Sequence, residues 1–385
     1  MKLAFVYQND LSEQTADVIA SISMVQALGN LFDVTFFASK TNSESLQKLL
    51  SDLDITKPNF KIVFVPISFK NNSSYERISR IVYAFYVLLN VRNFDFIFTR
   101  DFGFLYFLSL LPKTLKPKCK IIFEAHKIYH QVSSKVKLSQ EKEALKIPDL
   151  LVAITDGIKQ DMIKYFGIQS NKIGVVYSGV DVTFFRDLPR NAVGFLKLFP
   201  KTKDKRVIAY FGSFQTWKGV DTLVEACRFL NENEVHVIIV GSGSLADKKR
   251  FFDLIEFYKL HQVITFSDTL SRKEIVNCIK NTDIGIVPNN KEHISVNYTS
   301  PLKIFEYMAC DCPIIASNLP SINEVLKPDV NCRYFESENA EDLANQIMTL
   351  LKSKELCENM VSNNRVLVEN FSWAKRAQKI YEFIV

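Results

Sequence analysis

The sequence predicts an α/β fold made of two doubly wound, Rossmann-like domains, each with a parallel sheet. The 385 residues are enough for two domains of ordinary size. Short apolar runs recur along the chain, separated by amphipathic stretches, which is the pattern of parallel strands connected by helices. One stretch near the middle lacks this alternation and divides the runs into two series.

The apolar runs give the expected strands in chain order. Each run is short, rich in β-branched and aromatic residues, and bounded by polar or turn residues, as strands are. In the first half they are residues 3–7, 33–37, 61–66, 96–99, 120–123, 150–154 and 173–177. In the second half they are residues 207–211, 235–240, 263–266, 284–287, 314–316 and 332–335.

Residues 187–205 separate the two series. They contain Pro189, Pro200 and a lysine-rich turn, so we interpret them as a linker. The expected domains are residues 1–190 and residues 205–371. Doubly wound domains bind ligands at the carboxyl ends of their strands, so two crevices facing each other across a cleft are expected to form the site.

The composition excludes several classes of protein. With 47% hydrophobic and 23% charged residues and only 12 Gly and 12 Pro, the chain is globular, not disordered or collagenous. No apolar stretch has the roughly 18 residues that a membrane span needs, and we interpret residues 1–7 as a first strand, not a signal peptide. The seven cysteines form no C-x-x-C pair, which favours a cytoplasmic protein.

The net charge of +6 is distributed unevenly. Residues 1–190 carry the whole excess of +6, while residues 191–385 are neutral. The basic half either meets an anionic partner, such as a membrane surface, or is an ordinary lysine-rich solvated surface. Residues 75–92 form an apolar and basic helix candidate that either rests peripherally on the inner face of a membrane or covers the sheet. No motif favours nucleic-acid binding.

Nucleotide cofactors of the common kinds are not expected. The first strand ends without a glycine, and none occurs before Gly29, so the dinucleotide fingerprint is missing. The chain has no P-loop sequence either. Asp101-Phe102-Gly103 matches a kinase triplet without the other kinase motifs, and we regard the match as chance.

Residues 298–317 are the segment most indicative of a ligand-binding site. Their pattern predicts a loop, a helix, a turn and a strand, in that order. Ser300 is a candidate N-cap with Pro301 as first helical residue, so backbone N–H groups are free at this helix start. Lys303 in the first turn then favours a bound phosphate. Glu306, one turn further, is placed to reach a sugar hydroxyl of the same ligand. The alternative is an ordinary surface Lys303–Glu306 pair.

Residues 208–223 are a second cluster, a strand followed by a glycine-containing loop and a helix. Gly212 allows the backbone to approach a ligand at the strand end, and Lys218 adds a positive charge over the same crevice. Two lysines on one crevice suit a diphosphate. Taken alone, this segment is equally well a surface turn.

Together these residues resemble the retaining glycosyltransferases of family 4, which have the GT-B fold. The resemblance spans nearly the whole chain. The matching segments are residues 123–126, 148–155, 177–181, 212–219, 237–243, 283–288, 298–317, 320–325 and 371–373. The resemblance implies that a C-terminal helix, residues 372–385, completes the first domain.

The resemblance also implies roles for the site residues. Glu306 holds the donor ribose, Lys218 contacts the donor diphosphate with amides at the start of the Glu306 helix, and His126 faces the sugar and its reacting centre. These three form the expected catalytic set, although His126 is alternatively a plain strand-end histidine. The full expected donor site is Gly212, Ser213, Lys218, Tyr298, Ser300, Leu302, Lys303 and Glu306.

The sequence departs from the family pattern at three places. Tyr298 stands where relatives have the first glutamate of an E-x(7)-E pattern, and Glu292 replaces it only if its loop reaches back. Ser213 stands where many relatives have arginine, so Lys303 is expected to supply the missing charge. Residues 11–15 stand where relatives have a Gly-Gly loop near donor and acceptor.

The expected function is transfer of a sugar, with retention, from a nucleoside diphosphate sugar to an acceptor hydroxyl. The acceptor is expected to be a glycan, a lipid-linked saccharide or another hydroxyl compound in polysaccharide or glycoconjugate synthesis. No metal or other cofactor is expected, because the lysines and the helix start stabilise the leaving diphosphate and no D-x-D occurs between the strands. No convincing nucleophile is found, which favours same-face attack. The alternatives are a non-catalytic GT-B subunit that binds carbohydrate or nucleotide sugar, and a hydrolase or epimerase on the same fold.

Overall fold

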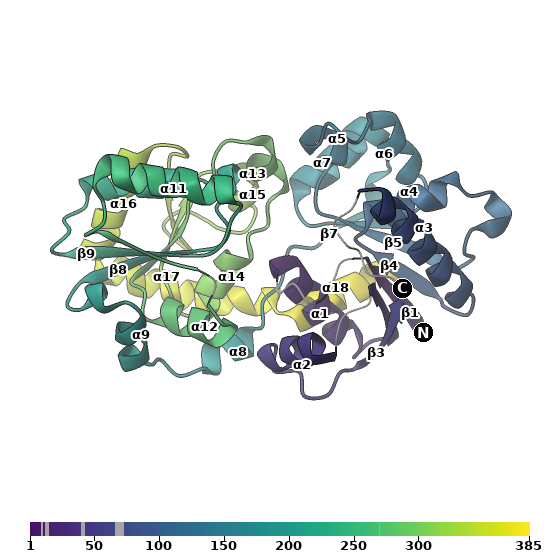
Figure 1. The fold of residues 1–385 in the computed structure, drawn as a ribbon, viewed down its shortest axis with the longest axis horizontal. Coiled ribbons are helices and arrows are strands. Elements are labelled where there is room, and N and C mark those ends of the chain that lie inside the picture. The colour runs from purple at the N-terminus through teal and green to yellow at the C-terminus, as the bar shows by residue number, and fades with distance from the viewer. Residues whose placement is uncertain (9–10, 12–14, 40–42, 66–72, 269) are drawn as a thin grey trace. The chain divides into compact units, whose positions relative to one another are not determined.

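The computed structural model describes residues 1–385 except 9–10, 12–14, 40–42, 66–72 and 269 (Figure 1). The described residues divide into two compact units, one comprising Met1–Tyr177 with Trp373–Val385 and the other Ser178–Ser372. Each unit contains one parallel sheet. The prediction of two doubly wound α/β domains is therefore confirmed.

The first unit is built on a seven-stranded sheet with the order β3-β2-β1-β4-β5-β6-β7. Every neighbouring pair of strands is parallel, so the carboxyl ends of all seven meet at one edge. The strands are β1 (Lys2–Tyr7), β2 (Asp33–Ser39), β3 (Phe60–Val65), β4 (Phe96–Thr99), β5 (Lys120–Ala125), β6 (Leu150–Ala153) and β7 (Ile173–Val175). Each corresponds to one of the apolar runs in the first half.

The helices of the first unit cover both faces of its sheet. They are α1 (Ala16–Leu28), α2 (Ser43–Asp52), α3 (Ser73–Asn90), α4 (Phe102–Leu110), α5 (Tyr129–Val132), α6 (Leu138–Ala144), α7 (Asp156–Phe166) and α18 (Trp373–Ile384). The core contains packed aromatic rings, with Phe5 stacked on Phe98 at 5.3 Å and edge-on to Phe36 at 5.6 Å. The C-terminal helix α18 shares this core through Ala377 and Ile380.

The second unit has a six-stranded sheet with the order β10-β9-β8-β11-β12-β13, again parallel throughout. Its strands are β8 (Arg206–Phe211), β9 (Val235–Val240), β10 (Ile264–Ser267), β11 (Ile284–Val287), β12 (Ile314–Ser317) and β13 (Arg333–Phe335). Its helices are α8 (Val182–Asp187), α9 (Ala192–Leu198), α10 (Val220–Ala226), α11 (Leu245–Tyr258), α12 (Arg272–Lys280), α13 (His293–Tyr298), α14 (Leu302–Ala309), α15 (Pro320–Asn323), α16 (Ala340–Lys352) and α17 (Lys354–Leu367).

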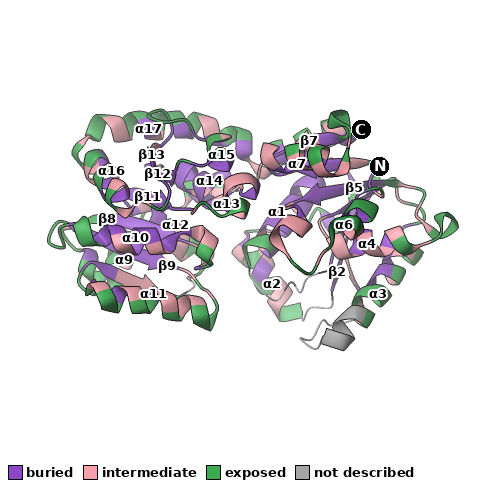
Figure 2. Cartoon of the chain, turned by 90° about the horizontal axis from the view of Figure 1, so that it is seen from above, coloured by how far each residue is buried: buried purple, intermediate pink, exposed green. Residues whose placement is uncertain are grey.

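In both units the strands are buried and the helices expose one side to solvent (Figure 2). Strands β9, β11 and β12 are buried at every position, which explains why they appear in the sequence as continuous apolar runs. Within the described residues, no helix is long and apolar enough to cross a membrane. All seven cysteines are free, and Cys310 and Cys312 are buried packing residues.

The stretch expected as a linker, residues 187–205, has regular structure that belongs to the second unit. Asn191 caps α9 by accepting a hydrogen bond from the Gly194 N–H at 2.8 Å. Asn277 of α12 holds the same turn, since its side-chain oxygen accepts from the Asn191 N–H at 2.8 Å. Residues 178–190, which the sequence assigned to the first domain, also group with the second unit.

Candidate functional site

The carboxyl edge of the second sheet brings together three tight backbone turns. Gly212 follows β8, Gly241 follows β9, and a Cβ atom on Gly241 would lie 1.8 Å from the Gly212 carbonyl oxygen. Gly219 has φ +66°, and a Cβ there would lie 1.9 Å from the Pro288 carbonyl oxygen at the end of β11. Only glycine fits at Gly219 and Gly241, because no larger residue leaves room for the neighbouring strand end.

The loop that carries Lys218 is fixed to the end of β11. The Asn290 N–H donates to the Trp217 carbonyl oxygen at 3.2 Å, and the Ser295 hydroxyl donates to the same oxygen at 2.6 Å. The half-buried Lys218 ammonium lies 3.8 Å from the centre of the Trp217 ring. Burial lowers the pKa of Lys218 to about 7.

Lys303 lies in the first turn of α14 and is 6% exposed. Its Nζ is buried without a hydrogen-bond partner, 3.6 Å from the centre of the Tyr210 ring. A Cβ added to Gly212 would lie 3.0 Å from this Nζ, so the ammonium is directed at the strand end. Burial and the nearby charge of Lys218 hold the pKa of Lys303 well below its usual range, while Glu306 acts in the opposite direction.

The two predicted lysines therefore lie at one edge, close enough for their charges to interact. Neither forms an ion pair with any described residue. Glu306 is half-buried on α14, and its pKa is raised by burial, against the lowering effects of Arg272 and Lys303. A group of basic side chains beside a helix start and tight glycine turns is suited to an anionic ligand.

Ser300 is not the N-cap of α14, so that prediction is wrong. The helix begins at Leu302 with Pro301 in the cap position, and no side chain caps it. The Ser300 hydroxyl oxygen instead accepts a hydrogen bond from the Ser178 N–H at 3.1 Å. Leu302, at the first position of α14, is half-buried.

The other predicted donor-site residues have mixed surroundings. The Ser213 carbonyl oxygen accepts from the Tyr210 hydroxyl at 2.7 Å, which places Ser213 next to Gly212 and Lys303. Tyr298 is 2% exposed and its ring packs against His293 at 4.9 Å. Because its side chain is enclosed, Tyr298 fills space in the second unit.

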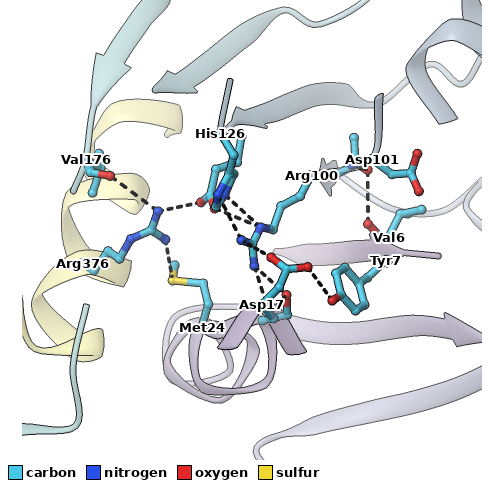
Figure 3. Close-up of polar contacts among 12 residues, drawn as sticks. Val6, Tyr7, Asp17, Met24, Arg100, Asp101, His126, Val176 and Arg376 are labelled. Atoms are coloured by element: carbon cyan, nitrogen blue, oxygen red, sulfur yellow. Dashed lines mark hydrogen bonds and ion pairs between the residues drawn. The ribbon is translucent and has the colours of Figure 1, made fainter. Parts of the chain in front are cut away.

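His126 directly follows β5 at the carboxyl edge of the first sheet and is held in a charged network (Figure 3). Its Nε2 lies 2.7 Å from the Glu124 carboxylate, and Arg100 contacts both ring nitrogens, at 3.0 and 3.3 Å. The imidazole is 33% exposed. Burial and Arg100 lower the pKa of His126, with Glu124 opposing them, which favours the neutral form of the ring.

Glu124 is the centre of this network. It is 3% exposed and pairs with Arg376 of α18 at 2.7 Å and with Arg100 at 3.2 Å. Burial by itself would raise the pKa of Glu124, but Arg376, the hydrogen bond to His126 and Arg100 hold it well below its usual range. Arg100 also pairs with Asp17 at 2.7 Å.

Several residues of these two clusters escaped the sequence analysis. Arg100 directly follows the predicted strand 96–99, and that position is a usable signal for a residue at the carboxyl edge. Arg272 follows Ser271, the N-cap of α12, but nothing in the sequence relates it to Glu306. No sequence pattern around Arg376 or Asp17 indicates that these residues belong to the site. The predicted loop over residues 11–15 lies largely outside the described residues.

The fold as a whole defines a class of protein. Two Rossmann-like units in one chain are the GT-B architecture, and a solved structure of HepE from Anabaena in complex with UDP matches with a TM-score of 0.79 and 16% identity over 99% of both chains. Sucrose-phosphate synthase from Thermosynechococcus elongatus matches with a TM-score of 0.78 and 17% identity over 99% of this chain and 97% of that one.

The sequence places the chain within that class. Residues 21–184 match the model of Glycosyltransferase Family 4, and residues 197–367 match that of Glycosyl transferases group 1. The chain therefore belongs to the family 4 glycosyltransferases, as the sequence predicted. D-inositol 3-phosphate glycosyltransferase from Rhodococcus jostii is 26% identical over 250 residues, 63% of this chain. The chain spans about half the length, 53%, of that relative.

Proposed function

We propose that the protein transfers a sugar from a nucleoside diphosphate sugar to an acceptor hydroxyl with retention. The observation that carries the proposal is the pair Lys218 and Lys303 at the edge of the second sheet, neither of which forms an ion pair with a described residue. A buried ammonium without a partner is costly, and a diphosphate would supply the missing negative charge.

Lys218, Lys303 and Glu306 then each have a role in donor binding. Lys218 and Lys303 bind the diphosphate and stabilise the charge that develops on it as the bond to the sugar breaks. The first N–H groups of α14 add to this field. Glu306 accepts hydrogen bonds from ribose hydroxyls. The lysines and the helix start supply the positive charge for departure of the leaving group, so we propose that no metal is needed.

His126 supplies the contribution of the first unit. Because Glu124 and Arg100 fix the orientation of the ring, a neutral imidazole that is one-third exposed is available at the edge of the sheet. We propose that it contacts a sugar hydroxyl of donor or acceptor. No nucleophile for a covalent intermediate is proposed, and attack of the acceptor on the face from which the diphosphate departs accounts for retention.

The donor and acceptor are proposed by class. UDP sugars are the first donors to test, because the Anabaena neighbour was solved with UDP and with UDP-glucose. The acceptor is proposed to be a glycan or a lipid-linked saccharide in polysaccharide or glycoconjugate synthesis in the cytoplasm.

A non-catalytic nucleotide-sugar-binding subunit is the second candidate. One observation favours it: both ring nitrogens of His126 already have partners within the first unit. If neither ring nitrogen is available to a substrate, the protein would bind a donor without turning it over.

The deciding experiment combines thermal shift and turnover with UDP-, GDP- and ADP-sugars, with and without EDTA. Stabilisation by one donor and slow hydrolysis insensitive to EDTA are expected. Lys218→Ala and Lys303→Ala are each expected to weaken donor binding roughly tenfold to a hundredfold, the range for losing a charged hydrogen bond. Lys249→Ala is the matched control, since this lysine pairs with Asp253 on an exposed helix surface.

Three outcomes are distinguishable. Stabilisation by a donor without turnover, in the presence of candidate acceptors, supports the binding subunit. Turnover that EDTA abolishes contradicts the metal-free proposal. If no nucleotide sugar stabilises the protein, or if both lysine variants bind donor like the Lys249 control, the donor-site assignment is wrong.

A further inference from the structure

Helix α3 of the first unit is apolar on two opposite sides. One side packs on the sheet, with Tyr83, Ala84 and Val87 fully buried and the Tyr83 hydroxyl donating to the Phe37 carbonyl oxygen at 2.7 Å. The opposite side carries exposed apolar residues at helical spacing, and we call them the α3 face. They are Ile78 (61% exposed), Ile81 (46%), Val82 (47%), Phe85 (46%) and Leu89 (64%).

The α3 face continues onto α4. The ring of Phe85 packs edge-on against Phe107 of α4 with their centres 5.1 Å apart. Leu110, three residues further along α4 and therefore on the same side of that helix, is 67% exposed. Such a contiguous apolar surface, built from two neighbouring helices, is typical of a binding surface.

The segments that carry the α3 face have an excess of positive charge, since residues 73–118 contain seven lysines and arginines and only three acids, Glu76, Asp95 and Asp101. Residues 78–94 and 102–118 contain no aspartate or glutamate. Their basic residues include Arg92, Lys113 and Lys118, which are exposed, and the half-buried Lys116, whereas Arg80 interacts with Asp101 and is not counted in the rim. A basic rim beside an apolar face is complementary to an anionic lipid surface, where apolar side chains enter the headgroup region and lysines meet lipid phosphates.

Helix α11 of the second unit shows that exposure alone does not make such a surface. Leu245 and Phe257 are 89% and 76% exposed, more than any residue of the α3 face. The lysines of α11 are paired with acids, however, Lys248 with Asp268 and Lys249 with Asp253 at 2.6 Å. This surface has no net attraction for anions, so α11 provides a matched comparison.

We propose that the α3 face docks the protein on an anionic lipid bilayer. The helix lies in the plane of the interface with Phe85 and Leu89 among the headgroups, and the lysines that follow α4 bind the lipid phosphates. Figure 2 shows the exposed side of α3. The proposal uses no residue of the donor site and stands whether or not the protein transfers sugars.

Co-sedimentation of the full chain with vesicles tests the proposal. Binding is expected to phosphatidylcholine vesicles containing phosphatidylglycerol, weaker at high salt, and little binding to pure phosphatidylcholine. Phe85→Ser with Leu89→Ser is expected to weaken binding to the anionic vesicles at least roughly tenfold, since each side chain loses its apolar contact with lipid. Lys113→Gln with Lys118→Gln is expected to have a similar effect of roughly tenfold.

The control is Leu245→Ser with Phe257→Ser on α11, which removes apolar side chains that are even more exposed and is expected to leave vesicle binding unchanged. Thermal unfolding and donor binding of every variant show whether the fold and the donor site are intact. Equal binding by the α3 and α11 variants overturns the proposal. So does light scattering that shows a dimer dissociated by Phe85→Ser and Leu89→Ser, because the α3 face would then hold a second copy.

Discussion

The carboxyl edges of the two sheets carry charge in opposite ways. At the first, two arginines, two carboxylates and a histidine form a connected network around the buried Glu124. At the second, Lys218 and Lys303 lie together without an ion pair among the described residues, although the charge of Glu306 acts on Lys303. A paired network stabilises and orients its members, whereas an unpaired buried charge weakens the fold and gains from a ligand that neutralises it. This difference supports the proposal that the first edge orients groups and the second binds an anion.

The largest expected change in stability tests the network at the carboxyl edge of the first sheet. Glu124→Gln removes the carboxylate that lies between Arg376 and Arg100, whose side chains are 4% and 8% exposed. The free energy of unfolding is expected to fall by about 3–5 kcal/mol, the cost of leaving a buried charge without its partner. Denaturant unfolding of the variant measures it.

Lys303→Met is the matched change at the second edge, since it removes a buried amino group that has no hydrogen-bond partner and forms no ion pair with a described residue. Its unfolding free energy is expected to stay equal or to increase. If Glu124→Gln and Lys303→Met destabilise the protein equally, the contrast between the two edges is wrong.

An intermediate effect is expected on the pH dependence of nucleoside diphosphate binding. The pKa of Lys218 is about 7 in the free protein, and a bound diphosphate raises it because the anion favours the charged form. Affinity is therefore highest below pH 7 and decreases as pH rises above it, by up to about tenfold per pH unit until the pKa of the complex is reached. Calorimetry at pH 8 in two buffers of different ionisation enthalpy should show proton uptake. Binding without proton uptake, and equally strong at pH 6 and 8, would contradict this role of Lys218.

The smallest change in stability is expected for a surface ion pair. Like the pair between Arg376 and Glu124, it joins an arginine to a carboxylate. Arg365 makes two contacts with Asp311, at 2.6 and 2.7 Å, while its side chain is 60% exposed. Arg365→Ala is expected to change the unfolding free energy by no more than about 1 kcal/mol, because solvent screens the pair. Thermal unfolding checks this value, and a loss as large as that of Glu124→Gln would show that burial does not set the strength of these pairs.

The sequence predicted the fold well because strands and helices can be identified from short patterns of neighbouring residues. Each strand is a buried apolar run, and the two lysines lie beside strand ends and a helix start that the same pattern locates. The first-unit network could not be predicted in this way, since Arg376 and Glu124 are 252 residues apart. Ser300 was misassigned because Ser300-Pro301 has the ordinary pattern of a helix start, while the hydroxyl is bound to the distant Ser178 backbone. The linker hypothesis overlooked Asn191, which caps α9.

The position of α18 has a consequence for the order in which the protein is made. Residues Trp373–Val385 belong to the first unit, although the whole second unit precedes them in the chain. On the ribosome, residues 1–177 are therefore complete long before Arg376 exists to neutralise Glu124. The first unit therefore cannot be completed until α18 has been made, and until then Glu124 lacks Arg376. Incompletely folded units expose apolar surface and are prone to aggregate, which is why chaperones bind them.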